Sequence, residues 1–61
     1  MSRLSDNLRK LIQSRISTAE EKLTETREWI DKLKSAGFTV TELEVKQSLQ
    51  EGELERLRLI L

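Results

Sequence analysis

Cysteine, histidine and proline are absent from this chain of 61 residues, which also has only two glycines, one Trp, one Phe and no Tyr. Without cysteine there is no disulfide, and without cysteine or histidine only carboxylates remain as strong metal ligands, which disfavours zinc. The commonest general base and the strongest nucleophile of enzymes are missing as well. No glycine-rich loop is present that could hold a phosphate. We therefore expect no enzymatic activity, no metal site and no cofactor.

An excess of charge of either sign is also lacking, because eleven Lys and Arg balance eleven Asp and Glu. A neutral chain does not have the overall positive field of a nucleic-acid-binding protein. No apolar run approaches the about 18 residues of a membrane span, and the first residues do not form the apolar core of a secretory signal. We expect a cytoplasmic protein without a membrane span.

The shortness of the chain limits its core. We expect a single domain over residues 1–61, and a chain of this length buries only about 60% of its unfolded surface. Folds of this size usually gain stability from disulfides, metals or a partner subunit. With the first two disfavoured, self-association is the remaining source of stability.

Apolar residues recur every three or four positions over the first 35 residues, which predicts one long helix from about residue 4 to 35. Ser2 or Ser5 would cap it, with Asp6 in the first turn. An alternative is a new helix beginning near Ser17, but the apolar stripe continues through that point without a phase jump. The residues on this face are Met1, Leu4, Leu8, Leu11, Ile12, Ile16, Ala19, Leu23, Thr26, Trp29, Ile30 and Leu33.

The segment Leu33–Lys46, "LKSAGFTVTELEVK", predicts a turn between two helices, at about residues 36–40. Gly37 fits the left-handed position after a helix, with Phe38 packing back on Leu33 in a Schellman motif. Thr39 with Glu42, or Thr41 with Glu44, would form a capping box for a second helix over about 41–60. The alternative is a short strand over residues 38–45, which are partly β-branched and partly alternating.

The second helix has two apolar sides. Val45, Leu49 and Ile60 lie off its main stripe, so one partner helix cannot cover all its apolar residues. Gly52 interrupts the apolar pattern of this helix. It would mark a kink, a frayed end or a close approach of another backbone, or it is a tolerated surface glycine. The main stripe consists of Leu43, Gln47, Gln50, Leu54, Leu57 and Leu61.

These elements predict an all-α fold, an antiparallel helical hairpin with a long first helix and a shorter second one. About fifteen N-terminal residues would project beyond the second helix. Burying their large apolar side chains favours a homo-oligomer, first of all a dimer, in the form of a four-helix bundle or larger helical oligomer. Another helical protein is the alternative partner. The residues expected at this interface are Leu4, Leu8, Leu11, Ile12, Arg15, Val45, Leu49, Leu57, Ile60 and Leu61.

Arg15 lies among apolar residues on the predicted face of the first helix. It would either pack its stem and extend its charged head to water, or form an ion pair that sets the register of an interface.

A DNA-reading helix-turn-helix is disfavoured, because Glu42 and Glu44 would face the phosphates and the first helix is too long. The expected function is therefore a non-enzymatic structural or protein-interaction module, such as a small assembly chaperone, an adaptor or a phage- or plasmid-type accessory protein. The alternative is a dimeric nucleic-acid-binding regulator with a basic N-terminal arm. That arm consists of Arg3, Arg9, Lys10 and Arg15.

Overall fold

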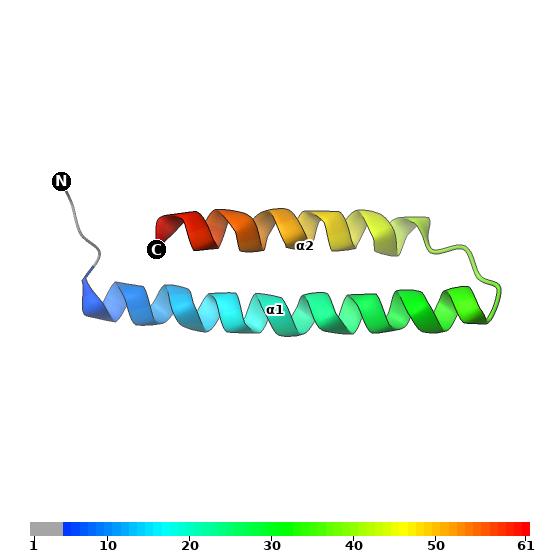
Figure 1. The fold of residues 1–61 in the computed structure, drawn as a ribbon, viewed down its shortest axis with the longest axis horizontal. Coiled ribbons are helices and arrows are strands. Elements are labelled where there is room, and N and C mark those ends of the chain that lie inside the picture. The colour runs from blue at the N-terminus through cyan, green and yellow to red at the C-terminus, as the bar shows by residue number, and fades with distance from the viewer. Residues whose placement is uncertain (1–4) are drawn as a thin grey trace.

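The computed structural model describes residues 5–61 and contains two antiparallel helices, α1 (Asp6–Ser35) and α2 (Thr41–Ile60), joined by a short turn (Figure 1). The pair forms a rod with extents of 51 × 16 × 10 Å. The predicted all-α hairpin with a long and a shorter helix is confirmed. The bounds of α2 agree with the prediction, and α1 begins at Asp6. The predicted start at Leu4 lies outside the described residues.

α1 runs without a break over 30 residues, so no second helix begins at Ser17. Ser5 is the N-cap, and its Oγ accepts a hydrogen bond of 3.2 Å from the backbone N–H of Leu8. This bond satisfies one of the N–H groups that a helix leaves unpaired in its first turn. Asp6 follows in that turn, where its negative charge faces the positive end of the helix dipole. Ser2, the other proposed cap, lies outside the described residues.

The end of α1 forms the predicted Schellman motif. Gly37 has a φ of 86°, a conformation that glycine adopts without steric cost. The N–H of Phe38 donates to the carbonyl of Leu33 at 2.9 Å, and the N–H of Gly37 donates to the carbonyl of Lys34 at 3.0 Å. Phe38 nevertheless stays 64% exposed, so most of its ring lies in water rather than against Leu33.

The start of α2 differs from the prediction. Val40 is the N-cap and makes no side-chain capping bond, so neither Thr39 nor Thr41 forms the expected capping box. The physical reason is burial, since Val40 is only 5% exposed. Its carbonyl accepts the first hydrogen bond of the helix, 2.9 Å from the N–H of Glu44. Packing an apolar residue at this position fixes where the helix begins. Residues 38–45 do not form the alternative strand.

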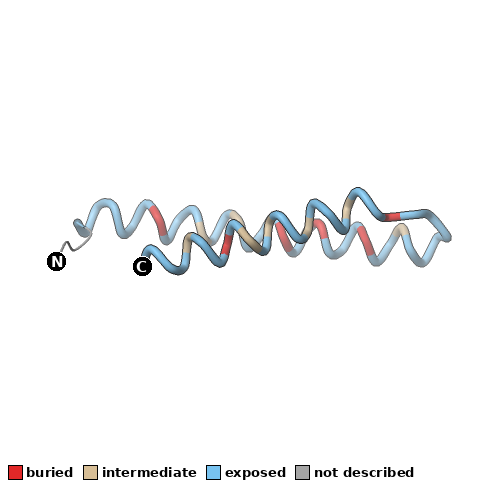
Figure 2. The backbone as a smooth tube through the Cα atoms, turned by 90° about the horizontal axis from the view of Figure 1, so that it is seen from above, coloured by how far each residue is buried: buried red, intermediate tan, exposed pale blue. Residues whose placement is uncertain are grey.

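The two helices meet along one narrow stripe, which we call the seam. Its residues follow the alternating three-four spacing of a coiled coil and are all buried or half-buried. Figure 2 shows the buried positions spread along the length of the pair. Each large apolar side chain buried here stabilises the hairpin by about 1.5 to 3 kcal/mol. The seam consists of Ile12, Ile16, Ala19, Leu23, Thr26, Ile30 and Leu33 on α1, and of Val40, Leu43, Gln47, Gln50, Leu54 and Leu57 on α2.

Polar side chains interrupt the middle of the seam. Thr26 is 6% exposed, and its hydroxyl donates to the carbonyl of Lys22 one turn earlier at 3.0 Å. The Oε1 atom of Gln50 is buried, and among residues 5–61 it has no hydrogen-bond partner. A buried acceptor without a partner costs about 1 to 3 kcal/mol, so we expect an apolar residue at this position to stabilise the hairpin.

Gly52 lies inside α2, which continues past it to Ile60. No atom of the described chain, outside its own helical backbone and its two neighbours, comes within 4 Å of the place where a Cβ would stand. A close approach of another part of this chain is therefore not the reason for the glycine.

Candidate interaction surface

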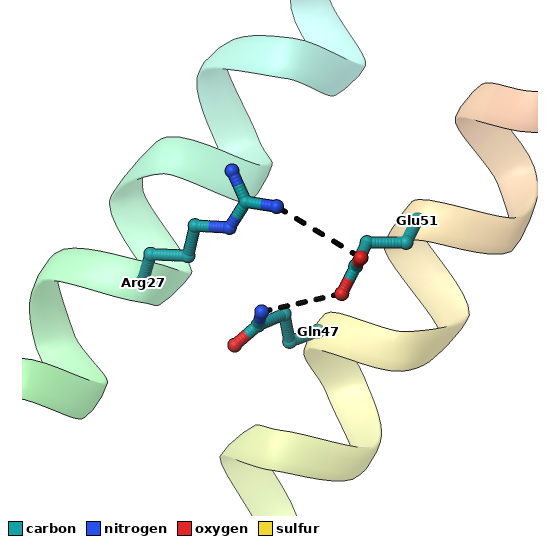
Figure 3. Close-up of polar contacts among 3 residues, drawn as sticks. All are labelled: Arg27, Gln47 and Glu51. Atoms are coloured by element: carbon teal, nitrogen blue, oxygen red, sulfur yellow. Dashed lines mark hydrogen bonds and ion pairs between the residues drawn. The ribbon is translucent and has the colours of Figure 1, made fainter.

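One long side of the hairpin carries three ion pairs between α1 and α2, and we call it the ion-paired face. The nitrogen–oxygen distances are 2.7 Å for Arg58–Glu20, 3.5 Å for Lys34–Glu44 and 3.9 Å for Arg27–Glu51. The partners recur at intervals of seven residues on each helix. They therefore form one row on α1 and one row on α2, both along the same side of the seam. Figure 3 shows the central pair, in which the Nε2 of Gln47 also donates to Glu51 at 3.2 Å.

The ion pairs align the helices more than they stabilise them. Their side chains are about half exposed, and exposed pairs are worth only about 0.2 to 1 kcal/mol each. A shift of the helices by one heptad would bring Glu20 beside Glu51, or in the other direction Arg27 beside Arg58. Either shift places one pair of like charges together. The charges of this face are thus matched within a single chain in the observed register.

The opposite side of the hairpin is hollowed into a groove of about 730 Å³ between the two helices, and we call this side the groove face. The side chains around the groove are basic, acidic, amide and aromatic, so it has no single charge. Those on α1 include Arg15, Lys22 and Trp29, and those on α2 include Lys46, Gln50 and Glu53.

Large apolar side chains lie on the groove face and stay in contact with water. Trp29 lines the groove and is 52% exposed. Leu8 stands seven residues before Arg15 and Leu11 seven before Thr18, which places both on helix rows that line the groove further along. They are 43% and 58% exposed. The two ion-pairing rows of the described chain carry no exposed large apolar residue, so the two long sides are chemically unlike.

The second apolar side predicted for α2 is divided between two directions. Ile60 follows Glu53 by seven residues and so belongs to the α2 row that lines the groove, where it is 52% exposed. Val45 belongs to a different row, on the back of α2 away from the seam, and is also exposed. Leu49, the third residue of the predicted side, is 69% exposed and lies in a row between these two. A single partner on the groove face would therefore cover Ile60 and leave Val45 in water.

The residues predicted for the interface differ in how far the hairpin itself buries them. Ile12 is only 8% exposed within one chain and belongs to the hairpin's own core. The apolar surface that α2 leaves open on α1 is therefore shorter than the predicted overhang of about fifteen residues. Leu8, Leu11, Arg15, Val45, Leu49, Ile60 and Leu61 are exposed, Leu57 is half-buried in the seam, and Leu4 lies outside the described residues.

Trp29 is less buried than its place on the predicted apolar face suggests. It lies at the edge of that face and is half in water. Lys32 holds its Nζ over the indole ring, 5.7 Å from the centroid. Heptad spacing is the signal in the sequence that could have placed it, because Trp29 follows Lys22 by seven residues and so belongs to a row beside the seam.

The basic N-terminal residues that the structure describes are open to solvent. Arg9, Lys10 and Arg15 are exposed, and within residues 5–61 none of them joins an ion pair. Arg3 lies outside the described residues. The use of this segment for nucleic-acid binding stays a prediction.

Other kinds of site have no counterpart in the part of the chain that the structure describes. Residues 5–61 hold no group of three or more carboxylates placed to bind a metal ion. Neither α1 nor α2 combines the length and the apolar character that crossing a membrane requires. Comparisons of the chain with protein-family models, with curated proteins and with solved structures gave no match.

Proposed function

We propose that this chain is a non-enzymatic protein-interaction module that self-associates through its groove face, with a dimer in the form of a four-helix bundle as the smallest assembly. The observation that carries the proposal is the difference between the two long sides. The ion-paired face has its charges matched within the chain, whereas the groove face leaves Leu8, Leu11 and Trp29 largely in water. A hollowed side that leaves large apolar side chains in contact with water, among polar ones, is typical of a binding surface.

The energetics support the same proposal. The core of the described hairpin consists of five apolar residues that are at most 8% exposed. A core of this size gives a chain of 61 residues only marginal stability. Covering Leu8, Leu11 and Trp29 would stabilise the assembly by about 25 cal/mol for each Å² of apolar surface removed from water. Candidate roles for such a module are an assembly chaperone, an adaptor or a small accessory protein of a phage or plasmid.

A pair of matched variants tests the proposal. Thr18 and Thr24 are both exposed residues of α1, but Thr18 lines the groove and Thr24 does not. We expect Thr18→Arg to weaken self-association about tenfold or more, because a bulky charge enters the covered face, while Thr24→Arg leaves it unchanged. Sedimentation velocity over a range of concentrations measures both. Equal behaviour of the two variants, or a wild-type chain that is monomeric throughout, would contradict the proposal.

Nucleic-acid binding by the N-terminal segment is the second candidate. The observation that favours it is the set of exposed basic residues there, Arg9, Lys10 and Arg15, which are in no ion pair of the described chain. Phosphate contacts release counterions, so the affinity would fall steeply with salt. Titration with duplex DNA and with RNA at low and high salt tests this candidate, and an absence of binding at low salt rejects it.

A further inference from the structure

We infer that the groove face is covered by a second copy of this chain in one particular orientation. In this arrangement the two α1 helices lie against each other, antiparallel, about a two-fold axis near the midpoint of α1. The inference rests on the proposed self-association and adds the orientation and the register. It is carried by the unequal lengths of the helices and by the order of residues along the groove face.

The unequal helix lengths favour an antiparallel pair of α1 helices. α1 has 30 residues and α2 has 20, and Arg58, near the end of α2, pairs with Glu20. The first turns of α1 therefore extend beyond α2 (Figure 1). A two-fold axis parallel to the helices would set each α1 against α2 of the other copy, which is too short to reach these turns. An axis perpendicular to the helices sets the α1 helices of the two copies against each other. The first turns of each α1 are then covered by the C-terminal half of the other α1.

Two rows of residues on α1 form the α1 side of the groove face. Positions in each row are seven residues apart, so each row runs along the helix in a nearly constant direction. The first row is Leu8, Arg15, Lys22 and Trp29. The second row is Leu11, Thr18, Glu25 and Lys32.

Antiparallel overlap of the two α1 helices sets the first row of one copy against the second row of the other. The midpoint of Asp6–Ser35 lies beside Glu20, and overlap about this residue brings Arg15 level with Glu25 of the second copy. It also brings Leu11 level with Trp29 of the second copy. Because the arrangement is two-fold symmetric, each of these contacts occurs twice.

The chemistry of the paired positions is complementary. Arg15 and Glu25 are both exposed, and within residues 5–61 neither is in an ion pair, so each is available to the other. Leu11 and Trp29 are each more than half exposed, and their contact would remove apolar surface of both from water.

The two remaining pairs of this register bring no like charges together. Leu8 would lie against the aliphatic stem of Lys32, whose charged head can still reach water. The positive charge of Lys22 would stand beside the neutral Thr18.

Neighbouring registers are less favourable. A shift by one heptad in one direction brings Arg15 level with Lys32 of the second copy, so that like charges meet, and sets Trp29 against a threonine. The opposite shift sets the charged Lys22 against Leu11 and the apolar Leu8 against a glutamate. Of these three registers, the one with full overlap of α1 is therefore the one that matches both charge and apolar surface.

Charge reversal tests the register. Arg15→Glu and Glu25→Arg each replace two attractions by two repulsions when a variant pairs with itself, and we expect each to raise the dimer Kd about tenfold. In a mixture of the two variants, the heterodimer again has an acid facing a base at both positions, so it should regain the wild-type affinity. Wild-type affinity of the separate variants, or no recovery in the mixture, would overturn this register. In the first of these cases the self-association itself would still stand.

A distance measurement tests the orientation independently. The chain has no cysteine, so Asn7→Cys, at an exposed position, introduces one spin label in each copy. In the antiparallel dimer the two labels are separated by about 26 residues along the helices, or about 40 Å at ~1.5 Å per residue. In a parallel dimer they lie at the same end, at about half that distance or less. A short distance would overturn the orientation and keep the proposed self-association, whereas a sample without dipolar coupling that sediments as a monomer would overturn both.

Discussion

Leu54 is the least exposed residue of the described core, at 4%, and Leu59, five residues later on the same helix, is 80% exposed. Substituting each by alanine removes the same atoms and makes the same change in intrinsic helix propensity. The difference between the two variants therefore isolates the contribution of seam packing. It does not depend on knowing the absolute stability of the hairpin.

The expected magnitude follows from burial. Leu→Ala at a buried site costs about 2 to 5 kcal/mol, because apolar contacts are lost and a cavity remains. A chain of this length has a total stability of about 3 to 9 kcal/mol, so Leu54→Ala removes a large part of it. This corresponds to a fall in Tm of about 20 °C. Leu59→Ala should change the free energy of unfolding by less than about 0.5 kcal/mol.

Thermal and urea unfolding followed by circular dichroism at one protein concentration measure both variants. A fixed concentration matters, because the stability of an associating protein depends on it. Equal losses in the two variants would show that the seam does not lie where the structure places it. The same conclusion would follow if Leu59→Ala were the more destabilising change.

Three more outcomes follow from the described contacts. Gly37→Ala should destabilise by about 1 to 2 kcal/mol, because the φ of 86° is unfavourable for a residue with a Cβ, whereas Gly52→Ala in the helix interior should stabilise by about 1 kcal/mol. Thermal unfolding measures the change in stability of each variant. A change of the same sign in both would contradict the backbone conformations described for the two glycines. Gln50→Leu should raise the Tm, since a buried oxygen without a hydrogen-bond partner in the described chain is removed, and a lower Tm would show that Gln50 has a partner in the assembly. Arg58→Glu should cost less than about 1 kcal/mol and recover when Glu20→Arg is added, as a double-mutant cycle in urea would show. A lasting loss in the double variant would mean that the pair does not align the helices.

The helices, the turn and the seam can be predicted because each depends on local chemistry. The regular spacing of Leu23, Thr26 and Ile30 sets which side of α1 is buried. Gly37 ends α1 because glycine suits the conformation at that point. The start of α2 is the exception. Capping-box spacing at the threonines of the turn describes a local preference, and burial of Val40, a tertiary effect, overrides it.

The exposure of side chains beside the seam, the ion pairs and the groove depend on tertiary structure that the spacing of residues in the sequence does not specify. A helical wheel says which direction Trp29 faces, but one partner helix covers only a narrow stripe, so a residue at the edge of that stripe stays half exposed. Pairing Glu20 with Arg58 requires an accurate register across the turn, and counting residues outward from the turn gives that register only approximately. The groove cannot be predicted from the sequence, since its depth depends on how the side chains beside the seam are arranged.

The emission of Trp29 across a dilution series tests most directly whether the groove face is the assembly surface. It is the only tryptophan of the chain, it lines the groove, and it is 52% exposed in the single hairpin. If a second copy covers this face, the emission maximum should shift to longer wavelength on dilution, over the same range in which the sedimenting mass falls to that of one chain of 7.1 kDa. An emission maximum that stays constant while the mass halves would place the contact elsewhere on the hairpin. A mass of one chain at every concentration would contradict self-association altogether.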